Sequence, residues 1–586
     1  MFLEHIDSPR DIHQLQKEDL PALVDETRAV LIDKLSNTGG HVASNLGVVE
    51  LTVALHYVFD SPRDKIVWDV SHQCYPHKIL TGRKQAYSDP AHYRDVTGFT
   101  NPKESEHDLF TIGHTATSIS LALGLAKGRD VFGRHENVIA VIGDGALSGG
   151  EAYEGLNCAG EYGGNLIVIL NDNEQSVAEN HGGLYRGLKA LRDSRGTCGD
   201  NLFRALGLDY RYLEDGHDVR KLTALFESVK DIDHPIVLHI HTVKGKGLPY
   251  AEADRENWHS GSPFFKESGI PKNGYPVYDT TVHDSLVDLL ERDEHAVVLT
   301  AGTPRAMGFV DGERDAWERN GRFVDVAIAE ENAMTMASGI AKAGGTAVFG
   351  VYAPFLQRAY DQTSHDVCLN NNPATILVLL PGVFGMRSNT HLGLCDIQML
   401  THIPNLVYLC PATKEEYLAM FRYATTQREH PVAIRVPPRF VSGGVEDTTD
   451  YSVMNRAQVI RSGRTAAIIA VGSLIPMALE AADAYRAAFG EDVTVISPRF
   501  LTGVDEPLLT SLRRDHALVV TLEDGELDGG YGQRIASFYG MNGIRVKNLG
   551  ISKAFHSDFD PKTLLKENGI SPEQILELLK EARSYQ

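Results

Sequence analysis

The chain has 586 residues, of which 42% are hydrophobic and 23% charged, and its formal net charge is −22. This length predicts about three or four domains, and the composition is typical of an ordinary globular protein. The negative charge argues against nucleic acid and anionic membranes as partners, because both bind basic surfaces. We find no apolar run near the ~20 residues of a membrane helix and no signal-peptide pattern, and we therefore expect a cytoplasmic protein.

Predicted helices and strands alternate from the start of the chain. Apolar spacing predicts helices over residues 20–36 and 48–57, and a buried strand over 66–70. Two glycines precede His41 in the loop between the helices, and His72 follows the strand. The two glycines make a flexible loop able to place the His41 imidazole at a site, and His72 is a candidate because α/β enzymes place catalytic groups after buried strands. The alternative is a structural role, because a histidine more often makes a structural hydrogen bond than takes part in catalysis.

A glycine-led turn, Gly113-His114-Thr115, follows next in the chain and leads into a predicted helix over residues 119–127. The backbone N–H groups at the start of a helix are ready to hold an anion, because they have no partner inside the helix. The turn is therefore a candidate for binding a phosphate group.

The stretch from Val141 to Asn173 organises the first part of the chain. Two buried runs, 138–142 and 166–170, flank a helix-competent segment, which predicts a parallel strand–helix–strand unit. The runs end in Gly143-Asp144-Gly145 and Asn171-Asp172-Asn173. Asp144 and Asn173 offer the hard oxygen ligands that Mg²⁺ prefers alongside phosphate. The alternative is a pair of ordinary turns, since Gly, Asn and Asp favour turns.

A polar, glycine-rich segment over residues 174–201 follows, and we predict that it is a mobile loop near the site. After a predicted strand over 236–241, Lys244 and Lys246 are either phosphate ligands or part of a solvated turn, and the sequence does not decide between them. His259 lies in the next loop.

Two composition changes divide the chain. Residues 269–278 and 440–450 are rich in turn-forming residues, and they predict domains over 1–275, 276–441 and 442–586. Each part alternates strand and helix patterns. We therefore predict an α/β protein with three doubly wound, mostly parallel-sheet domains.

The second predicted domain carries a further group of polar and aromatic candidates. A buried strand over residues 324–329 ends at Glu330, and a predicted helix follows over 332–342. An acid at a strand end often only caps the next helix, so Glu330 has a structural alternative. Tyr352, Phe355 and Arg358 come after it, and Arg387 and His391 lie in the loop after a predicted strand over 376–380.

These motifs, in this order, resemble the 1-deoxy-D-xylulose-5-phosphate synthase family of transketolase-like thiamine-diphosphate enzymes. The resemblance covers nearly the whole chain. It is carried by the runs GGHVASNLGVVELT, WDVSHQCYPHKILTGR, GHTATSIS, the GDG and NDN motifs, IAEE, YAPFLQRAYDQ and VISPRFLTGVDEPLL.

The resemblance implies a homodimer that binds thiamine diphosphate and Mg²⁺, with a diphosphate-binding, a pyrimidine-binding and a C-terminal domain. It implies Mg²⁺ ligands at Asp144, Asn173 and Gln175. Cofactor contacts are implied for His72, Gly113, His114, Thr115, Gly145, Ala146, Asn173, Glu330 and Phe355. Catalytic roles are implied for Glu330, His41, His72, His259 and His391, and Tyr352 and Arg358 are implied to line the substrate cavity.

The reaction that the resemblance implies joins pyruvate to glyceraldehyde 3-phosphate with loss of CO₂ and supplies isoprenoid, thiamine and pyridoxal biosynthesis. Two alternatives remain at this point. One is a related carboligase or transketolase with another acceptor or donor. The other is a protein that binds the cofactor without catalysis.

The chain departs from the family pattern near the acceptor site. Glu331 and Asn332 stand where the family usually has Gln and His, Leu380 replaces a phosphate-binding Arg, and Arg387 replaces an Asp. A second family Arg is displaced in the run Val436-Pro437-Pro438-Arg439, and the loop after Asn173 is shorter. One hypothesis is that Arg387 or Arg439 takes over phosphate binding, since guanidinium matches phosphate geometry.

Overall fold

The computed structural model describes residues 1–275, 279–310, 312–541 and 543–585. Its contacts divide the chain into two compact units. The first comprises Met1–Val277 with Ala327–Ala329, and the second comprises Tyr278–Val326 with Glu330–Gln586. The first predicted domain boundary adjoins residue 276, which lies outside the described residues.

The first unit contains a five-stranded parallel sheet of order β1-β2-β3-β5-β4. Its strands are β1 (Lys65–Trp68), β2 (Val138–Gly143), β3 (Leu166–Asp172), β4 (Asp209–Leu213) and β5 (Pro235–His241). Gly143 pairs with Asn171, and Asp172 pairs with His241. This register places the polar residues that follow β2 and β3 at one edge of the sheet.

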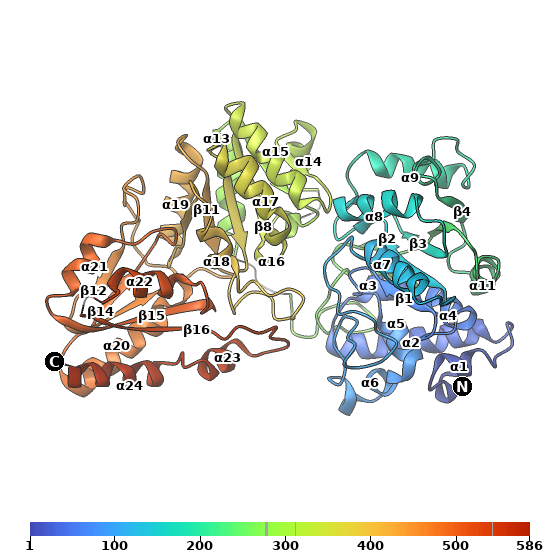
Figure 1. Cartoon of the computed structure of the whole chain (residues 1–586), viewed down its shortest axis with the longest axis horizontal. Coiled ribbons are helices and arrows are strands. Elements are labelled where there is room, and N and C mark those ends of the chain that lie inside the picture. Colours follow the sequence, from blue (N-terminus) through green and yellow to red (C-terminus); the bar gives the residue numbers. More distant parts are fainter. Residues whose placement is uncertain (276–278, 311, 542, 586) are drawn as a thin grey trace. The chain divides into compact units, whose positions relative to one another are not determined.

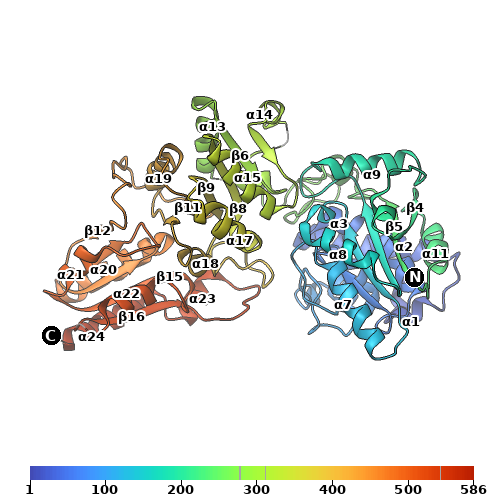
Figure 2. The ribbon, with the colours of Figure 1, turned by 45° about the horizontal axis from the view of Figure 1, so that its top comes forward.

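Helices cover both faces of this sheet (Figures 1 and 2). Successive strand residues point to opposite faces, so Ile139 and Val141 belong to one apolar core with α2, α4 and α11, while Ala140 and Ile142 belong to another with α7 and α8. The α-helices of the first unit are α1 (Pro9–Ile12), α2 (Leu20–Thr38), α3 (Val42–Leu46), α4 (Val49–Val58), α5 (Tyr75–Lys78), α6 (Gln85–Ser88), α7 (Ser118–Val131), α8 (Gly150–Gly160), α9 (Gly183–Asp193), α10 (Leu202–Ala205), α11 (Val219–Glu227) and α12 (Pro249–Ala253).

The second unit contains two sheets. The six-stranded parallel sheet has the order β10-β11-β9-β8-β6-β7, and the five-stranded sheet has the order β12-β14-β13-β15-β16, with β12 antiparallel to β14. The strands are β6 (Ala296–Thr300), β7 (Phe323–Asp325), β8 (Thr346–Tyr352), β9 (Thr375–Leu379), β10 (Val407–Leu409), β11 (Val432–Val436), β12 (Gln458–Arg461), β13 (Thr465–Ala470), β14 (Thr494–Ser497), β15 (His516–Glu526) and β16 (Arg545–Ile551).

One apolar core joins the two sheets of the second unit, because it includes Phe349 and Ile376 of one sheet and Ile469 and Val519 of the other. The α-helices are α13 (Thr281–Arg292), α14 (Asp315–Arg319), α15 (Glu330–Lys342), α16 (Ala353–Leu356), α17 (Tyr360–Gln362), α18 (Asp396–Thr401), α19 (Lys414–Thr426), α20 (Ile475–Phe489), α21 (Glu506–Leu512), α22 (Tyr531–Tyr539), α23 (Pro561–Glu567) and α24 (Pro572–Ala582).

A buried ion group also links these two sheets. Arg435 of β11 binds Asp396 of α18 and Asp524 of β15, each at 2.7 Å. The shared core and this group explain why two sheets form one compact unit. In the part of the chain that the structure describes, no helix has the length and apolar character needed to span a membrane.

The predicted α/β class with three mostly parallel sheets is confirmed. Several local predictions were wrong. Residues 183–193 form helix α9 rather than a loop, because Leu188 and Leu191 reach the apolar core. The predicted strand over 324–329 stops at Asp325, and Glu330 begins α15 instead of ending a strand.

Candidate active site

Asp144 and Asn173 lie together at the carboxyl edge of β2 and β3. The backbone N–H of Asp144 donates to the carbonyl of Asn171 at 3.1 Å, and Asn173 follows β3 by one residue. Asp144 is only 1% exposed. Burial, with the charge of Asp172 second, raises the pKa of Asp144 to about 8. This carboxylate is ionised at neutral pH only if positive charge comes close to it.

The oxygen atoms at this edge fit a divalent cation. The Oδ1 atom of Asn173 is buried and has no hydrogen-bond partner among the described residues. A carboxylate short of positive charge and an unsatisfied amide oxygen are the donor set that Mg²⁺ takes in proteins. Gly145 leaves no room for a side chain here, since an added Cβ would lie 2.7 Å from Ser176 Oγ. Gln175 lies in the same turn and forms an isolated antiparallel β-bridge with Glu179.

Helix α9 and the turn before it bring three further residues to this edge, none of which was predicted. Asn180 Nδ2 donates to Asp144 Oδ2 at 2.6 Å, and the Tyr185 hydroxyl lies 3.3 Å from the Asp144 carbonyl oxygen. Arg192 binds Asp172 at 2.5 Å and Glu174 at 2.9 Å. The sequence signal that could have placed these residues was the apolar spacing of helix α9, which glycines interrupt.

Three imidazoles form a second group in the first unit. The ring centroids of His41 and His72 are 5.3 Å apart, those of His72 and His259 are 5.2 Å apart, and those of His41 and His259 are 5.7 Å apart. Asn45 Nδ2 donates to the backbone carbonyls of His41 and His72, each at 2.7 Å. The loops that carry two of the rings are thus tied to one buried amide.

Lys244 connects the imidazoles to the carboxyl edge of β2 and β3. Its Nζ donates to the carbonyl of Ser176 and lies 3.2 Å from His259 Nδ1. Burial lowers the pKa of Lys244 to about 7, although the charge of Asp144 acts in the opposite direction. Burial, followed by the charge of Lys244, lowers the pKa of His41 to about 4 and that of His259 well below its usual range. His41 and His259 are therefore neutral imidazoles beside one titratable amine.

The turn that precedes α7 contains Gly113, His114 and Thr115. Asp69 at the end of β1 accepts the backbone N–H groups of Ala116 and Ser118, each at 2.9 Å. The Asp69 carboxylate therefore already accepts two of the backbone N–H groups that we expected to be available to an anion. The assignment of Gly113, His114 and Thr115 to a phosphate remains a prediction.

Glu330 lies in the second unit and is 3% exposed. Burial raises its pKa, against the opposing charge of Arg358, whose Nη1 lies 3.7 Å from Glu330 Oε2. Phe355 lies nearby in sequence, and its ring centroid is 5.7 Å from that of Tyr352 and 5.4 Å from that of His391. His391 Nδ1 is 2.8 Å from Thr390 Oγ1.

The two arginines proposed for phosphate binding are both exposed. The backbone carbonyl of Arg387 accepts the N–H of Asp558 at 2.8 Å, which ties its loop to the C-terminal part of the same unit. Leu380, at the position of the missing family arginine, is partly buried with a φ of 53°. The roles of Arg387 and Arg439 remain predictions.

The predicted site residues form two sets, one in each unit. The first unit holds His41, His72, Gly113, His114, Thr115, Asp144, Gly145, Ala146, Asn173, Gln175 and His259. The second unit holds Glu330, Tyr352, Phe355, Arg358, Arg387, His391 and Arg439.

Comparison with known proteins matches almost the entire chain. The family model described as 1-deoxy-D-xylulose-5-phosphate synthase matches residues 3–199 and 192–242. The transketolase pyrimidine-binding domain matches 276–441, and the transketolase C-terminal domain matches 455–575.

Similar proteins include the 1-deoxy-D-xylulose-5-phosphate synthases of Halothermothrix orenii, with 38% identity over 94% of this chain and 93% of that protein, and of Thermomicrobium roseum, with 39% identity over 98% and 96%. A solved transketolase from Campylobacter jejuni has 15% identity, a TM-score of 0.45 and coverage of 97% of this chain and 100% of that one.

The fold and the matched domains define a transferase of the transketolase type, an enzyme class that uses thiamine diphosphate and acts on small molecules. Within this class, the chain belongs to the 1-deoxy-D-xylulose-5-phosphate synthase family.

Proposed function

We propose that the protein joins pyruvate to glyceraldehyde 3-phosphate, with release of CO₂, to form 1-deoxy-D-xylulose 5-phosphate. The observation that carries the proposal is the buried Asp144 carboxylate together with the buried Oδ1 atom of Asn173, oxygen atoms that fit Mg²⁺, in a chain of this family. The negative net charge of −22 does not oppose anionic substrates, because the cations that bind them are local.

In this proposal Asp144, Asn173 and the backbone of Gln175 hold Mg²⁺, and residues Gly113–Thr115, Gly145 and Ala146 contact the diphosphate. His72, Glu330 and Phe355 contact the rest of the cofactor. Bound thiamine diphosphate supplies the electron sink that decarboxylation requires. The oxygen atoms of the first unit support this assignment, because the Asp144 carboxylate and the Asn173 amide oxygen are hard donors of the kind that Mg²⁺ takes.

The side chains of the protein then provide position and proton transfer. Glu330 is buried beside Arg358, and a buried acid with a raised pKa can hold a proton at a ring nitrogen. His41, His72, His259 and His391 exchange protons with substrate oxygens, because imidazole is the side chain whose ordinary pKa lies nearest to neutral pH. Tyr352 and Arg358 line the substrate cavity.

The same proposal includes a cytoplasmic homodimer with three domains, over residues 1–275, 276–441 and 442–586. The match of the pyrimidine-binding domain to residues 276–441 supports the proposed second domain, and the match of the C-terminal domain to 455–575 falls within the proposed third.

A second candidate is a carboligase with the same cofactor and another acceptor. It is favoured by the partly buried, apolar Leu380 and by the exposure of Arg387 and Arg439. An acceptor without a phosphate group would need neither arginine.

One experiment separates these functions. Purified protein with Mg²⁺ and thiamine diphosphate is given pyruvate, with and without glyceraldehyde 3-phosphate, while CO₂ is measured and the product is identified by mass spectrometry. Acceptor-stimulated CO₂ release with a deoxyxylulose phosphate product supports the first function. CO₂ release that glyceraldehyde 3-phosphate does not stimulate favours the second, and binding of the cofactor without CO₂ release from any 2-oxo acid contradicts both.

A further inference from the structure

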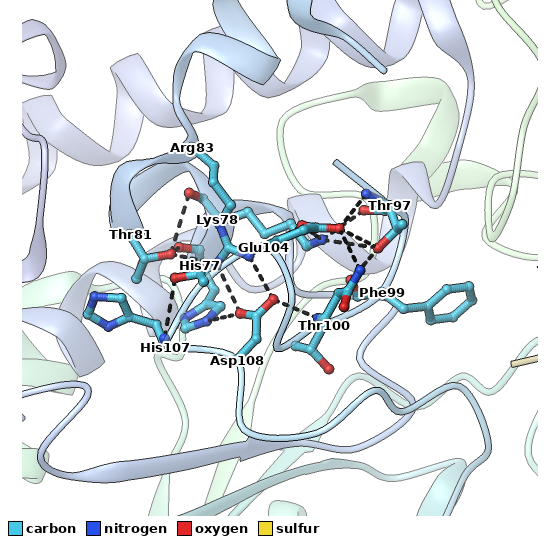
Figure 3. Close-up of polar contacts among 12 residues, drawn as sticks. His77, Lys78, Thr81, Arg83, Thr97, Phe99, Thr100, Glu104, His107 and Asp108 are labelled. Carbon is cyan, nitrogen blue, oxygen red and sulfur yellow. Dashed lines mark hydrogen bonds and ion pairs between the residues drawn. The ribbon is translucent and has the colours of Figure 1, made fainter. Parts of the chain in front are cut away.

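A group of buried polar side chains, most of them charged, lies between α5 with its following turn (Ile79–Arg83) and the irregular segment 97–108 (Figure 3). Lys78 binds Glu104 at 2.5 Å, and Arg83 binds Asp108 at 2.6 Å. His77 Nε2 lies 3.0 Å from Asp108 Oδ1. These five side chains, called the charged cluster here, are each at most 10% exposed.

The charged cluster fixes the chain before Phe99. Lys78 Nζ donates to the carbonyl of Thr97 at 2.9 Å, and Glu104 Oε1 accepts the Thr97 backbone N–H at 2.8 Å. The Thr97 hydroxyl in turn donates to the carbonyl of Phe99 at 3.0 Å. Buried ion pairs hold their partners in one geometry, because an unpaired buried charge is costly.

The chain after Phe99 is held in the same manner. Asp108 Oδ2 accepts the backbone N–H of Asn101 at 2.7 Å. Ser71 Oγ accepts the backbone N–H of Thr100 at 2.9 Å. Segment 97–101 therefore has a defined conformation although it contains no helix or strand.

Within segment 97–101, the ring of Phe99 points away from the charged cluster, as Figure 3 shows. The ring meets His41 edge to face, with a centroid distance of 5.6 Å and an interplanar angle of 66°. The other groups that face His41 are His72, His259, the Tyr75 hydroxyl at 3.4 Å from Nδ1, and the charge of Lys244. Phe99 is the apolar member of this set.

We propose that Phe99 is a positioning residue for His41, and that the charged cluster holds Phe99 in place. The ring fixes the orientation of the imidazole through an edge-to-face contact and keeps water from that side of it. The proposal rests on the proposed function only in assigning His41 to the reacting site. The direction of the His41 pKa agrees with it, because an apolar wall disfavours the charged imidazole.

The test uses the purified full chain with Phe99→Ala, Phe99→Leu and Glu104→Gln. Phe132→Ala is the matched control, since that phenylalanine is 71% exposed. Histidine-selective ¹³C NMR follows the imidazole titrations, and the His41 resonance is identified by its loss in His41→Asn. Circular dichroism confirms folding of each variant.

In Phe99→Ala we expect the titration midpoint of His41 to rise by about one pH unit, because water reaches the ring. We also expect the turnover number for pyruvate to fall about tenfold with little change in KM, as for a group that orients a proton donor. Phe99→Leu should give a smaller rise, because it retains apolar volume, and Glu104→Gln should shift His41 in the same direction. Phe132→Ala should match the wild type.

An unchanged His41 titration in folded Phe99→Ala would overturn the positioning role. An unchanged titration in Glu104→Gln would overturn the role of the charged cluster. If the titration shifts as expected but the wild type releases no CO₂ from pyruvate, the proposed function fails while the positioning of His41 by Phe99 stands.

Discussion

The amide of Asn180 donates a 2.6 Å hydrogen bond to Asp144 Oδ2, while the amide oxygen of Asn180 is buried without a hydrogen-bond partner among the described residues. One oxygen of the Asp144 carboxylate is thus fixed, and the carboxylate keeps a single orientation toward Asn173. The Tyr185 hydroxyl, 3.3 Å from the Asp144 carbonyl, ties helix α9 to the same edge. The structure therefore links a helix that the sequence did not predict to the proposed cation site.

We expect Asn180→Ala to raise the dissociation constant of Mn²⁺ about tenfold, measured by electron paramagnetic resonance in the presence of thiamine diphosphate. A hydrogen bond to a charged group contributes on the order of 1.5–3 kcal/mol, and 1.4 kcal/mol corresponds to about tenfold in affinity. Asp144→Ala should weaken Mn²⁺ binding further, because it removes a ligand.

The control for this measurement is Lys189→Ala on α9, since that side chain is 63% exposed and forms an ion pair with Asp193 of the same helix. Wild-type Mn²⁺ affinity in Asn180→Ala would show that its hydrogen bond does not support the site. Wild-type affinity in Asp144→Ala would contradict the cation site itself.

The second prediction concerns Glu330, which is buried beside Arg358. We expect Glu330→Ala and Glu330→Gln to lower the turnover number by about 10²–10⁴, the usual contribution of a positioned acid or base. Folding should persist, because burial already disfavours the Glu330 carboxylate. The measurements are steady-state CO₂ release and thermal melting. Glu331→Ala is the matched control, and near-wild-type turnover in Glu330→Ala would refute the assignment.

The carboxyl edge of β2 and β3 shows what the sequence predicts well. Asp144 and Asn173 each follow a strand of buried apolar residues, so their place at a parallel sheet edge follows from local pattern alone. The three-sheet architecture could be predicted for the same reason. Local pattern also placed the histidines in loops, although not their distances from one another.

Helix α9 and the charged cluster show what the sequence could not predict. Helix α9 was not predicted because three glycines with low helix propensity interrupt its apolar spacing: Gly182, Gly183 and Gly187. The helix forms because burial of Leu188 in the core outweighs that low propensity. The contact between Arg83 and Asp108 joins residues 25 positions apart through side chains alone. Such pairings depend on the three-dimensional path of the chain, and no periodicity records them.

The third prediction separates the two arginines proposed for the acceptor phosphate. If Arg387 binds the phosphate, Arg387→Ala should raise the KM for glyceraldehyde 3-phosphate about tenfold and leave that for pyruvate unchanged, since a charge-assisted contact is lost. If Arg439 binds it, Arg439→Ala should do so instead. Both side chains are exposed, so neither change should lower the melting temperature. Unchanged KM in both variants would favour an acceptor without a phosphate group.

The fourth prediction concerns stability at acid pH. Burial, with the charges of His77 and Arg83, lowers the pKa of His107 to about 4 from 6.5. Its Nδ1 lies 2.9 Å from Ser61 Oγ. Between these two pKa values the unfolded chain binds a proton that the folded protein does not. The contribution of His107 to stability is therefore present above about pH 6.5 and is lost as the pH falls toward 4.

Between pH 6.5 and 4, we expect the free energy of unfolding of His107→Asn to fall by roughly 1–2 kcal/mol less than that of the wild type. This figure allows for the partial exposure of the ring. Other buried neutral histidines, such as His56, add to the decline in both proteins, because burial also lowers the pKa of that ring. Denaturant unfolding at a series of pH values measures the difference. His295→Asn is the control, since that ring is 73% exposed. Parallel curves for wild type and His107→Asn would show that His107 does not contribute to acid sensitivity.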